Sequence, residues 1–198
     1  MLFPYRNFLL TAGLVTTLTL NQCYAGQDLD LIASVTNTTC QTQVSDGGTV
    51  NLGTVDLNYF PADVTAETEY GGGKTFTIEV TGCSTDAAST TPTQIKMNFI
   101  PQSGHLANGN LQVFANDDEQ LSTGAKNVGI VIFSTESGAQ PYNILAQDGT
   151  SRAIFTITSG DLISSTWTFY SRMQRVVNSL APQPGVVRSR VLVDVYYE

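Results

Sequence analysis

The residues that could do chemistry are few, and two conspicuous runs do not complete a known kind of site. The run GGGKT at residues 71–75 is similar to the end of a phosphate-binding loop, but Thr68 stands where the first glycine belongs. A strand-forming segment follows it, whereas phosphate binding needs a helix N-terminus there. The run NDDEQ at residues 116–120 clusters three carboxylates without the glycine and later glutamate of a calcium loop. The first run predicts a turn, and the second predicts a solvated loop.

Nucleophilic catalysis needs a base beside the nucleophile, and the chain has a single histidine. His105 lies in the turn-rich segment PQSGHLANGN, and although Ser103 is near it, the chain contains no G-x-S-x-G nucleophile elbow. No nucleophile–base pair can be assembled from these residues. We therefore expect no enzyme, no catalytic or metal-binding residue and no cofactor.

The first 25 residues have the pattern of a secretory signal peptide. Arg6 is the single charge, a 13-residue apolar run follows, and the small residues of CYA end at Ala25. The apolar run is shorter than the roughly 20 residues that span a bilayer. Cys23 could suggest lipid attachment, but bulky Asn and Gln precede it where small residues are needed. We expect an exported mature chain that begins at Gly26 and has no membrane span.

Cleavage after Ala25 removes Cys23 and leaves Cys40 and Cys83, an even pair in a chain bound for an oxidising compartment. A metal site or a catalytic thiol lacks a nearby histidine. A disulfide is the prediction, and closing a loop of this length contributes on the order of 4 kcal/mol in the loop-entropy model.

The mature chain reads as strands separated by turn residues. No stretch of ordinary helix length has a convincing helical period, and the chain length suits one domain with a real core. A net charge of −8 with only nine Lys and Arg argues against a nucleic-acid ligand. Seven or eight short strands predict an all-β sandwich. The strand-like segments are TVNLGTVD, KTFTIEV, TQIKMNFI, NVGIVIFS, RAIFTIT, TWTFYSRM and RVLVDVYY.

Both ends of the mature chain alternate apolar and polar residues, which is typical of a strand with one buried face. A strand that runs to a chain terminus frays unless another strand pairs with it. An unpaired apolar edge is also an aggregation hazard, so each end pairs within the chain or with another chain. The inward positions are Leu29, Leu31, Ala33 and Val35 at the N-terminus and Val191, Val193, Val195 and Tyr197 at the C-terminus.

The chain resembles the pilin subunits of chaperone–usher fimbriae, the type 1 fimbrial protein family of Gram-negative bacteria. The resemblance covers the mature chain through TNTTCQTQV, VNLGTV, FTIEVTGCS and NVGIVIF. The most specific motif is C-terminal. Such pilins carry a penultimate tyrosine and a glycine fourteenth from the end, and Tyr197 and Gly185 occupy these positions.

The resemblance implies an incomplete immunoglobulin-like sandwich that lacks its last strand, with an open groove beside the C-terminal strand. A periplasmic pilus chaperone would fill the groove, pair with the inward C-terminal residues and anchor the carboxylate of Glu198. At an outer-membrane usher, donor-strand exchange would replace the chaperone by the N-terminal extension of a neighbouring fimbrial subunit. The implied domains are a signal peptide at 1–25, a donor strand at 26–35 and a pilin domain at 36–198. Ala33 stands where family donor strands commonly have glycine.

The same reasoning suggests a stalk or minor adaptor subunit of a cell-surface fimbria that supports cell adhesion, because the chain is too short to add a lectin domain. The alternative is a self-contained secreted β-sandwich binding protein whose terminal strand pairs internally. That alternative predicts a soluble monomer without any partner, whereas a pilin should aggregate, polymerise or be degraded.

Overall fold

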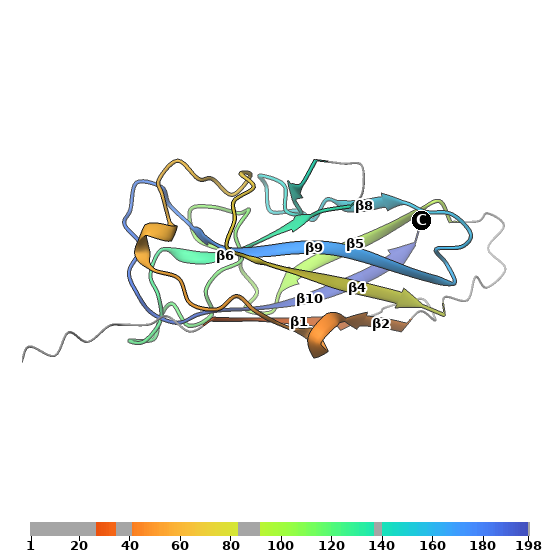
Figure 1. Cartoon of the computed structure of the whole chain (residues 1–198), viewed down its shortest axis with the longest axis horizontal. Coiled ribbons are helices and arrows are strands. Elements are labelled where there is room, and N and C mark those ends of the chain that lie inside the picture. The colour runs from red at the N-terminus through yellow and green to blue at the C-terminus, as the bar shows by residue number, and fades with distance from the viewer. Residues whose placement is uncertain (1–26, 35–40, 83–91, 137–139, 198) are drawn as a thin grey trace, which may run out of the picture.

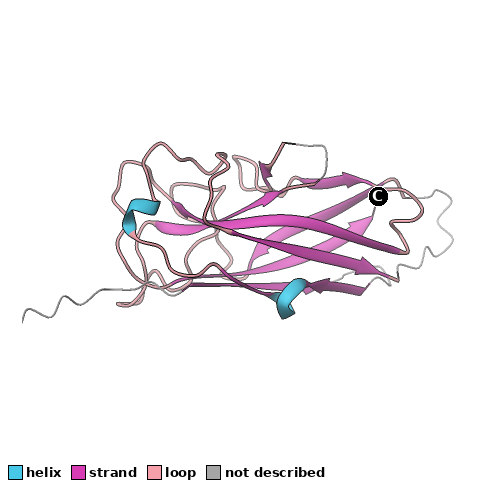
Figure 2. Cartoon of the chain, viewed as in Figure 1, coloured by secondary structure: helices cyan, strands magenta, loops and turns pink. Residues whose placement is uncertain are grey.

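The computed structural model describes residues 27–34, 41–82, 92–136 and 140–197, and regular structure there is almost entirely strand (Figure 2). Two short 3-10 helices, η1 (Ser45–Gly48) and η2 (Leu57–Tyr59), are the helices of this part of the chain. No helix in it is both long and apolar enough to cross a membrane. The strands are β1 (Gln27–Ser34), β2 (Gln41–Val44), β3 (Thr49–Asn51), β4 (Lys74–Thr81), β5 (Gln94–Pro101), β6 (Val128–Ser134), β7 (Tyr142–Asn143), β8 (Ala153–Thr156), β9 (Ser164–Arg175) and β10 (Val187–Tyr197).

The strands form two five-stranded sheets that face each other along the length of the molecule (Figure 1). One sheet has the order β3-β1-β10-β5-β8, and the other has the order β2-β4-β9-β6-β7. Among these strands the neighbours run antiparallel, except β1 and β10, which run parallel. The predicted all-β sandwich is confirmed, and two strands, β2 and β7, were not predicted.

Aromatic side chains fill the space between the sheets. Phe169 is fully buried on β9, and its ring lies 5.5 Å from that of Phe76 and 5.3 Å from that of Phe99. Phe155 stacks on Trp167 at 4.6 Å. Because side chains alternate along a strand, these inward residues recur at every second position, as their sequence pattern predicts.

Part of the second sheet, β6 and the last residues of β9, is buried on its outer face as well, because residues 60–73, here called loop 60–73, pack over it. All seven residues of β6 are buried, although only every second one faces the other sheet. Ala66 of the loop packs with Val131, Phe133 and Val176 in a second apolar cluster. This face therefore behaves as core.

Buried polar side chains fasten loop 60–73 to the same face. Arg172, 1% exposed, donates from Nη2 to the carbonyl oxygens of Thr65 at 2.9 Å and Thr68 at 2.7 Å. Gln174 donates from Nε2 to the carbonyl oxygen of Val64 at 2.9 Å. Burial lowers the pKa of the Arg172 guanidinium from its ordinary value. The carbonyl oxygen of Thr65 also accepts from the amide of Thr68 at 3.1 Å, so the loop is held by a turn of its own as well as by the two side chains.

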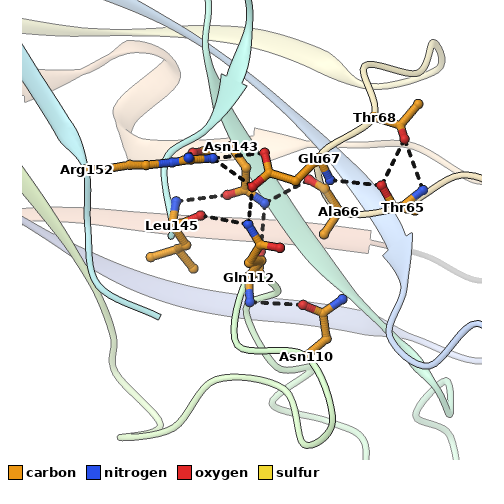
Figure 3. Close-up of polar contacts among 9 residues, drawn as sticks. All are labelled: Thr65, Ala66, Glu67, Thr68, Asn110, Gln112, Asn143, Leu145 and Arg152. Carbon is orange, nitrogen blue, oxygen red and sulfur yellow. Dashed lines mark hydrogen bonds and ion pairs between the residues drawn. The ribbon is translucent and has the colours of Figure 1, made fainter. Parts of the chain in front are cut away.

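A second set of polar contacts, drawn in Figure 3, holds the middle of the loop. Arg152 donates from Nη2 to both carboxylate oxygens of Glu67, at 2.8 and 2.9 Å. Asn143 is fully buried and donates from Nδ2 to the carbonyl oxygens of Ala66 and Gln112, both at 2.9 Å. Gln112 in turn donates to Glu67. Sequence reasoning missed this network, because its members lie far apart in the sequence and no local pattern links them.

Candidate functional site

The last strand, β10, has the alternation that its sequence predicts. Val191, Val193 and Val195 are at most 1% exposed, and Tyr197 is half-buried against the same core. Arg188 and Arg190, on the opposite face, are exposed. Valine is favoured here because a β-branched side chain suits a pleated surface that is buried on one side. On one edge β10 pairs with β5, in the register Val191↔Pro101 to Tyr197↔Ile95.

The other edge of β10 is filled by the chain's own N-terminal strand. β1 lies parallel to β10 from Gln27↔Val187 to Ser34↔Asp194 (Figure 1). We expected this groove to be open, and in this structure it is closed. Alternation alone predicts which residues of β1 face inward but not which groove receives them.

Two leucines of β1 contribute to the core. Leu29 is fully buried and Leu31 is 3% exposed, as predicted for the inward face. Their burial contributes about 3–6 kcal/mol, at about 1.5–3 kcal/mol for each side chain. Ala33 occupies the register position opposite Val193. Val35, the fourth predicted inward residue, lies outside the described residues. The leucines therefore act in the subunit's own core when β1 is in place.

Gly185 is a glycine because backbone lies where its side chain would be. A Cβ there would collide with the backbone of residues 123–125. The next residue, Val186, donates its amide to the carbonyl oxygen of Thr123 at 2.8 Å and accepts from the amide of Ala125 at 2.9 Å. These bonds fix the chain just before β10 begins, so Gly185 helps to position β10.

Tyr197 is the last residue of β10. Burial raises the pKa of its phenol, and a hydrogen bond with Ser165 of β9 acts in the opposite direction. Ser165 also accepts from Nε1 of Trp167 at 3.0 Å. The penultimate tyrosine thus connects β10 to the opposite sheet. Glu198, the predicted carboxylate anchor, lies outside the described residues.

Cys40 and Cys83 also lie outside the described residues, so their disulfide stays a prediction. Their described neighbours along the chain are paired, because Gln41 of β2 lies opposite Thr81 of β4. Gln41 follows Cys40 directly, and Thr81 precedes Cys83 by two residues.

The other chemical runs have structural explanations. Lys74 begins strand β4 directly after the glycines of residues 71–73, so the phosphate-loop interpretation stays excluded. His105 is exposed in a loop. No group of three His, Cys, Asp or Glu residues that could hold a metal is found in the described segments.

The prediction of a solvated loop at residues 116–120 was wrong. Asn116 is 4% exposed, and its Nδ2 donates to the carbonyl oxygens of Ala125 and Val186 at 3.0 and 2.9 Å. The side chain of Asp117 is 7% exposed and accepts from Nε of Arg190 at 3.1 Å. The Asp117 side chain is covered here because Arg190, near the beginning of β10, supplies its partner, whereas Asp118 and Glu119 are half-buried and Gln120 is exposed.

The chain is similar in sequence to fimbrial proteins. A family model described as "Fimbrial protein" matches residues 30–198. The chain is 42% identical over 174 residues to the uncharacterized fimbrial-like protein YadK of Escherichia coli strain K12, which covers 88% of this chain and 86% of that protein. Among solved structures, the CupB6 tip adhesin of Pseudomonas aeruginosa matches 71% of this chain and 36% of its own, with 12% identity and a TM-score of 0.39.

Proposed function

The chain belongs to the fimbrial protein family, and from that premise we propose that it is a structural subunit of a chaperone–usher fimbria, a stalk or minor adaptor subunit that polymerises by donor-strand exchange. It passes through the periplasm and ends in a fimbria on the bacterial cell surface, where it supports cell adhesion. Its partners are a periplasmic pilus chaperone, an outer-membrane usher and the neighbouring subunits. The proposed disulfide between Cys40 and Cys83 staples β2 to β4.

The observation that carries the proposal is the origin of the strand that closes the groove. The three buried valines of β10 need a strand beside them, and that strand is β1, which would begin the mature chain after the predicted cleavage. Residues 35–40 join it to β2 in the other sheet. A strand at a chain end can leave a sheet and be replaced without unthreading any other segment. Main-chain hydrogen bonds of this kind are how one protein adds a strand to the sheet of another.

The same edge of β10 suits a chaperone strand before assembly. The chaperone would take the place of β1, pair with β10 and cover Val191, Val193, Val195 and Tyr197, while it anchors the carboxylate of Glu198. Removal of β1 would then cost the subunit little in that complex. In the fibre, Leu29, Leu31, Ala33 and Val35 would fill the groove of a neighbour.

Deletion of residues 27–31 is the direct test. The expected result is a subunit that still forms a complex with the cognate chaperone but does not enter fibres, because the deleted stretch completes a neighbour's core. Leu31→Asp should act in the same way, since a carboxylate costs several kcal/mol in an aliphatic groove. Asp63→Asn, in the exposed part of loop 60–73, is the control.

Two measurements are paired in this test: the chaperone complex recovered by affinity purification, and surface fibres labelled by immunogold. Loss of the chaperone complex together with the fibres would assign residues 27–31 to the subunit's own fold and remove the donor-strand proposal.

Internal pairing of β1 with β10 is the observation that favours the second candidate, a self-contained secreted β-sandwich binding protein. Because β1 fills the groove, a soluble monomer no longer distinguishes this candidate from a pilin. The distinguishing result is the fibre assay. A self-contained protein should stay out of the fibres even when a chaperone, an usher and the other subunits are present.

A further inference from the structure

Ile163 is the most exposed large apolar side chain of the described residues, at 74%. It ends the turn that leads into β9, and its neighbour Leu162 is buried in the core, so the turn is anchored. The amides of Ile163 and Ser164 donate to the carbonyl oxygen of Gly160 at 3.1 and 3.3 Å, and Gly82 donates its amide to the carbonyl oxygen of Ile163 at 3.1 Å. The isoleucine is therefore presented to solvent on a fixed backbone.

The turn of residues 158–163, here called the Ile163 turn, also carries a negative charge. Asp161 accepts through Oδ2 from the amide of Thr158 at 2.6 Å and from the hydroxyl of the same residue at 2.8 Å. These bonds lower the pKa of the Asp161 carboxyl from its ordinary value, so the group is ionised at neutral pH. A surface that receives this turn should therefore be apolar and have a cation at its edge.

An open pocket of about 670 Å³ lies beyond the other end of β9. This volume is in the range of ordinary binding pockets, which is roughly 300–1,000 Å³. Lys126 and Glu119 are its charged lining residues, and Leu180 lines it while being 56% exposed. The apolar residues of the lining are Ala107, Val128, Val176, Val177, Leu180 and Ala181.

Hydrogen bonds hold the pocket in shape. Asn127, in the left-handed conformation at φ 57°, donates from Nδ2 to the carbonyl oxygens of Val177 at 3.0 Å and Leu180 at 2.6 Å. Its Oδ1 accepts from the amide of Val177 at 2.8 Å. The side-chain amide of Asn116 donates to two backbone carbonyls and accepts from two backbone amides. Because these two side chains are already engaged, an apolar group suits the pocket better than a polar ligand.

The Ile163 turn and the pocket lie at opposite ends of the molecule. Ile163 directly precedes β9 and Val176 directly follows it, so an extended strand separates them by roughly 40 Å. Figure 1 shows the β8–β9 connection at the end that carries the C-terminus and the β9–β10 connection at the opposite end. The two surfaces cannot meet within one chain. They can meet between copies stacked head to tail, and such a contact repeats without closing.

A donated β1 would leave its own subunit at the Ile163 end. Residues 35–40 link β1 to β2, and Gln41, the first residue of β2, lies opposite Thr81 of β4. Thr81 in turn lies opposite Ser164 of β9, the residue that follows Ile163. The root of the proposed donor strand and the exposed isoleucine therefore lie on neighbouring strands at one end of the sandwich.

The groove of the acceptor begins beside the pocket. The bridges Gly124↔Val186 and Lys126↔Gln183 hold the segment before β10 against residues that line or flank the pocket. A donor strand that enters at the beginning of β10 therefore carries the Ile163 turn of its own subunit toward the pocket. Entry at the other end of β10 would bring two Ile163 ends together and close a pair, which cannot grow into a fibre.

We propose that the Ile163 turn of one subunit docks in this pocket of a second copy of the chain, with Asp161 beside Lys126, and that this contact stacks copies head to tail. The inference rests on the proposed donor-strand exchange and adds a second contact to it. Burial of one isoleucine side chain changes an association constant by roughly tenfold to a hundredfold. The chain is then a repeating stalk subunit, of which many copies follow one another.

Cross-linking within assembled fibres tests this inference. Ser164→Cys places a thiol beside Ile163, and Ala181→Cys places one in the lining of the pocket; both native residues are exposed. A short bismaleimide should join copies of the double variant into a ladder of multiples that persists after denaturation. Each single variant should give no ladder.

A charge on the isoleucine shows whether the turn itself makes the contact. Ile163→Asp, added to the double variant, should lower the cross-linked fraction of the subunits in the fibres at least ~10-fold, because a carboxylate is costly among apolar lining residues. Ile154→Asp alters an isoleucine that is 43% exposed on β8, and as the matched control it should leave the ladder unchanged. Equal ladders in these two variants would overturn the docking of Ile163.

Immunogold labelling of the same fibres separates failure of the inference from failure of the proposed function. Fibres that contain the double variant but give no ladder would overturn the head-to-tail contact while leaving donor-strand exchange in place. Covalent pairs from Ser164→Cys alone would mean that two Ile163 ends meet, and the pocket would not be their partner. If the wild-type chain never entered fibres, the proposed function itself would fall, and the inference would fall with it.

Discussion

Two pairs of neighbouring strands, β1–β10 and β6–β9, are here called seams of the sandwich. Both bury aliphatic side chains between the sheets, but they differ on their outer faces. At β6–β9 the outer face is covered by loop 60–73, which Arg172 and Gln174 fasten through its carbonyl groups. At β1–β10 the outer face carries exposed Arg188 and Arg190. The β6–β9 seam is therefore covered on both faces, whereas the β1–β10 seam is covered only on its inner face.

The difference indicates which seam can open. Separating β6 from β9 exposes two apolar faces and breaks buried hydrogen bonds, each of which costs about 1–3 kcal/mol when a partner is left unsatisfied. Separating β1 from β10 exposes Leu29 and Leu31, for about 3–6 kcal/mol, and it also uncovers one side of the three buried valines of β10 and breaks the main-chain bonds between the two strands. We therefore expect the β6–β9 seam to stay closed and the β1–β10 seam to be the one that can be exchanged.

The largest expected effect comes from a charge at a buried, inward-facing position of β10. Val193→Asp places a carboxylate at a fully buried position that β1, a chaperone strand or a donor strand must all cover. Co-purification with the cognate chaperone should be abolished. Tyr196→Asp, on the half-exposed outer face of the same strand, is the matched control and should be recovered with the chaperone.

Recovery of Val193→Asp at the wild-type level would show that the chaperone does not cover β10, and the groove would then have to be placed elsewhere.

A smaller effect is expected from Arg172→Ala, which acts on the permanent seam. The carbonyl group of Thr68 would lose its Arg172 donor, and that of Thr65 would keep only the amide of Thr68, so the free energy of unfolding should fall by about 3–5 kcal/mol. Urea unfolding of the mature chain measures it. Arg175→Ala, on the same strand with a single bond to the carbonyl of Leu180, should cost less than about 1 kcal/mol.

Equal costs for the two arginine variants would contradict the view that loop 60–73 makes this seam permanent.

Much of the sandwich could be predicted from sequence because burial on one face leaves a period of two. The segments of β4, β5, β6, β8, β9 and β10 follow that period or consist of unbroken β-branched and aromatic residues. β2 and β7 have four and two residues, and polar residues dominate them, so no pattern distinguishes them from loops.

The sequence also identified β10 as the strand beside the groove, but it did not identify the strand that fills the groove. Alternation is the same when a strand is read in either direction, so Leu29 and Leu31 indicate an inward face without a partner or an orientation. The burial of Asp117 and Arg172 was missed for a related reason. Charged residues are taken as exposed unless a partner is known, and here the partners lie far away in the sequence.

Native-state hydrogen exchange of the mature chain, read amide by amide, tests the central claim most directly, because it measures the opening of each seam in the same molecule. The account predicts that the amides of β1 exchange through a local opening, at least ~10-fold faster than those of β6 and β9, which should exchange only with global unfolding. Exchange of the β1 amides at the same slow rate as those of β6 and β9 would mean that β1 is a permanent strand of this subunit, and the exchangeable seam would not exist.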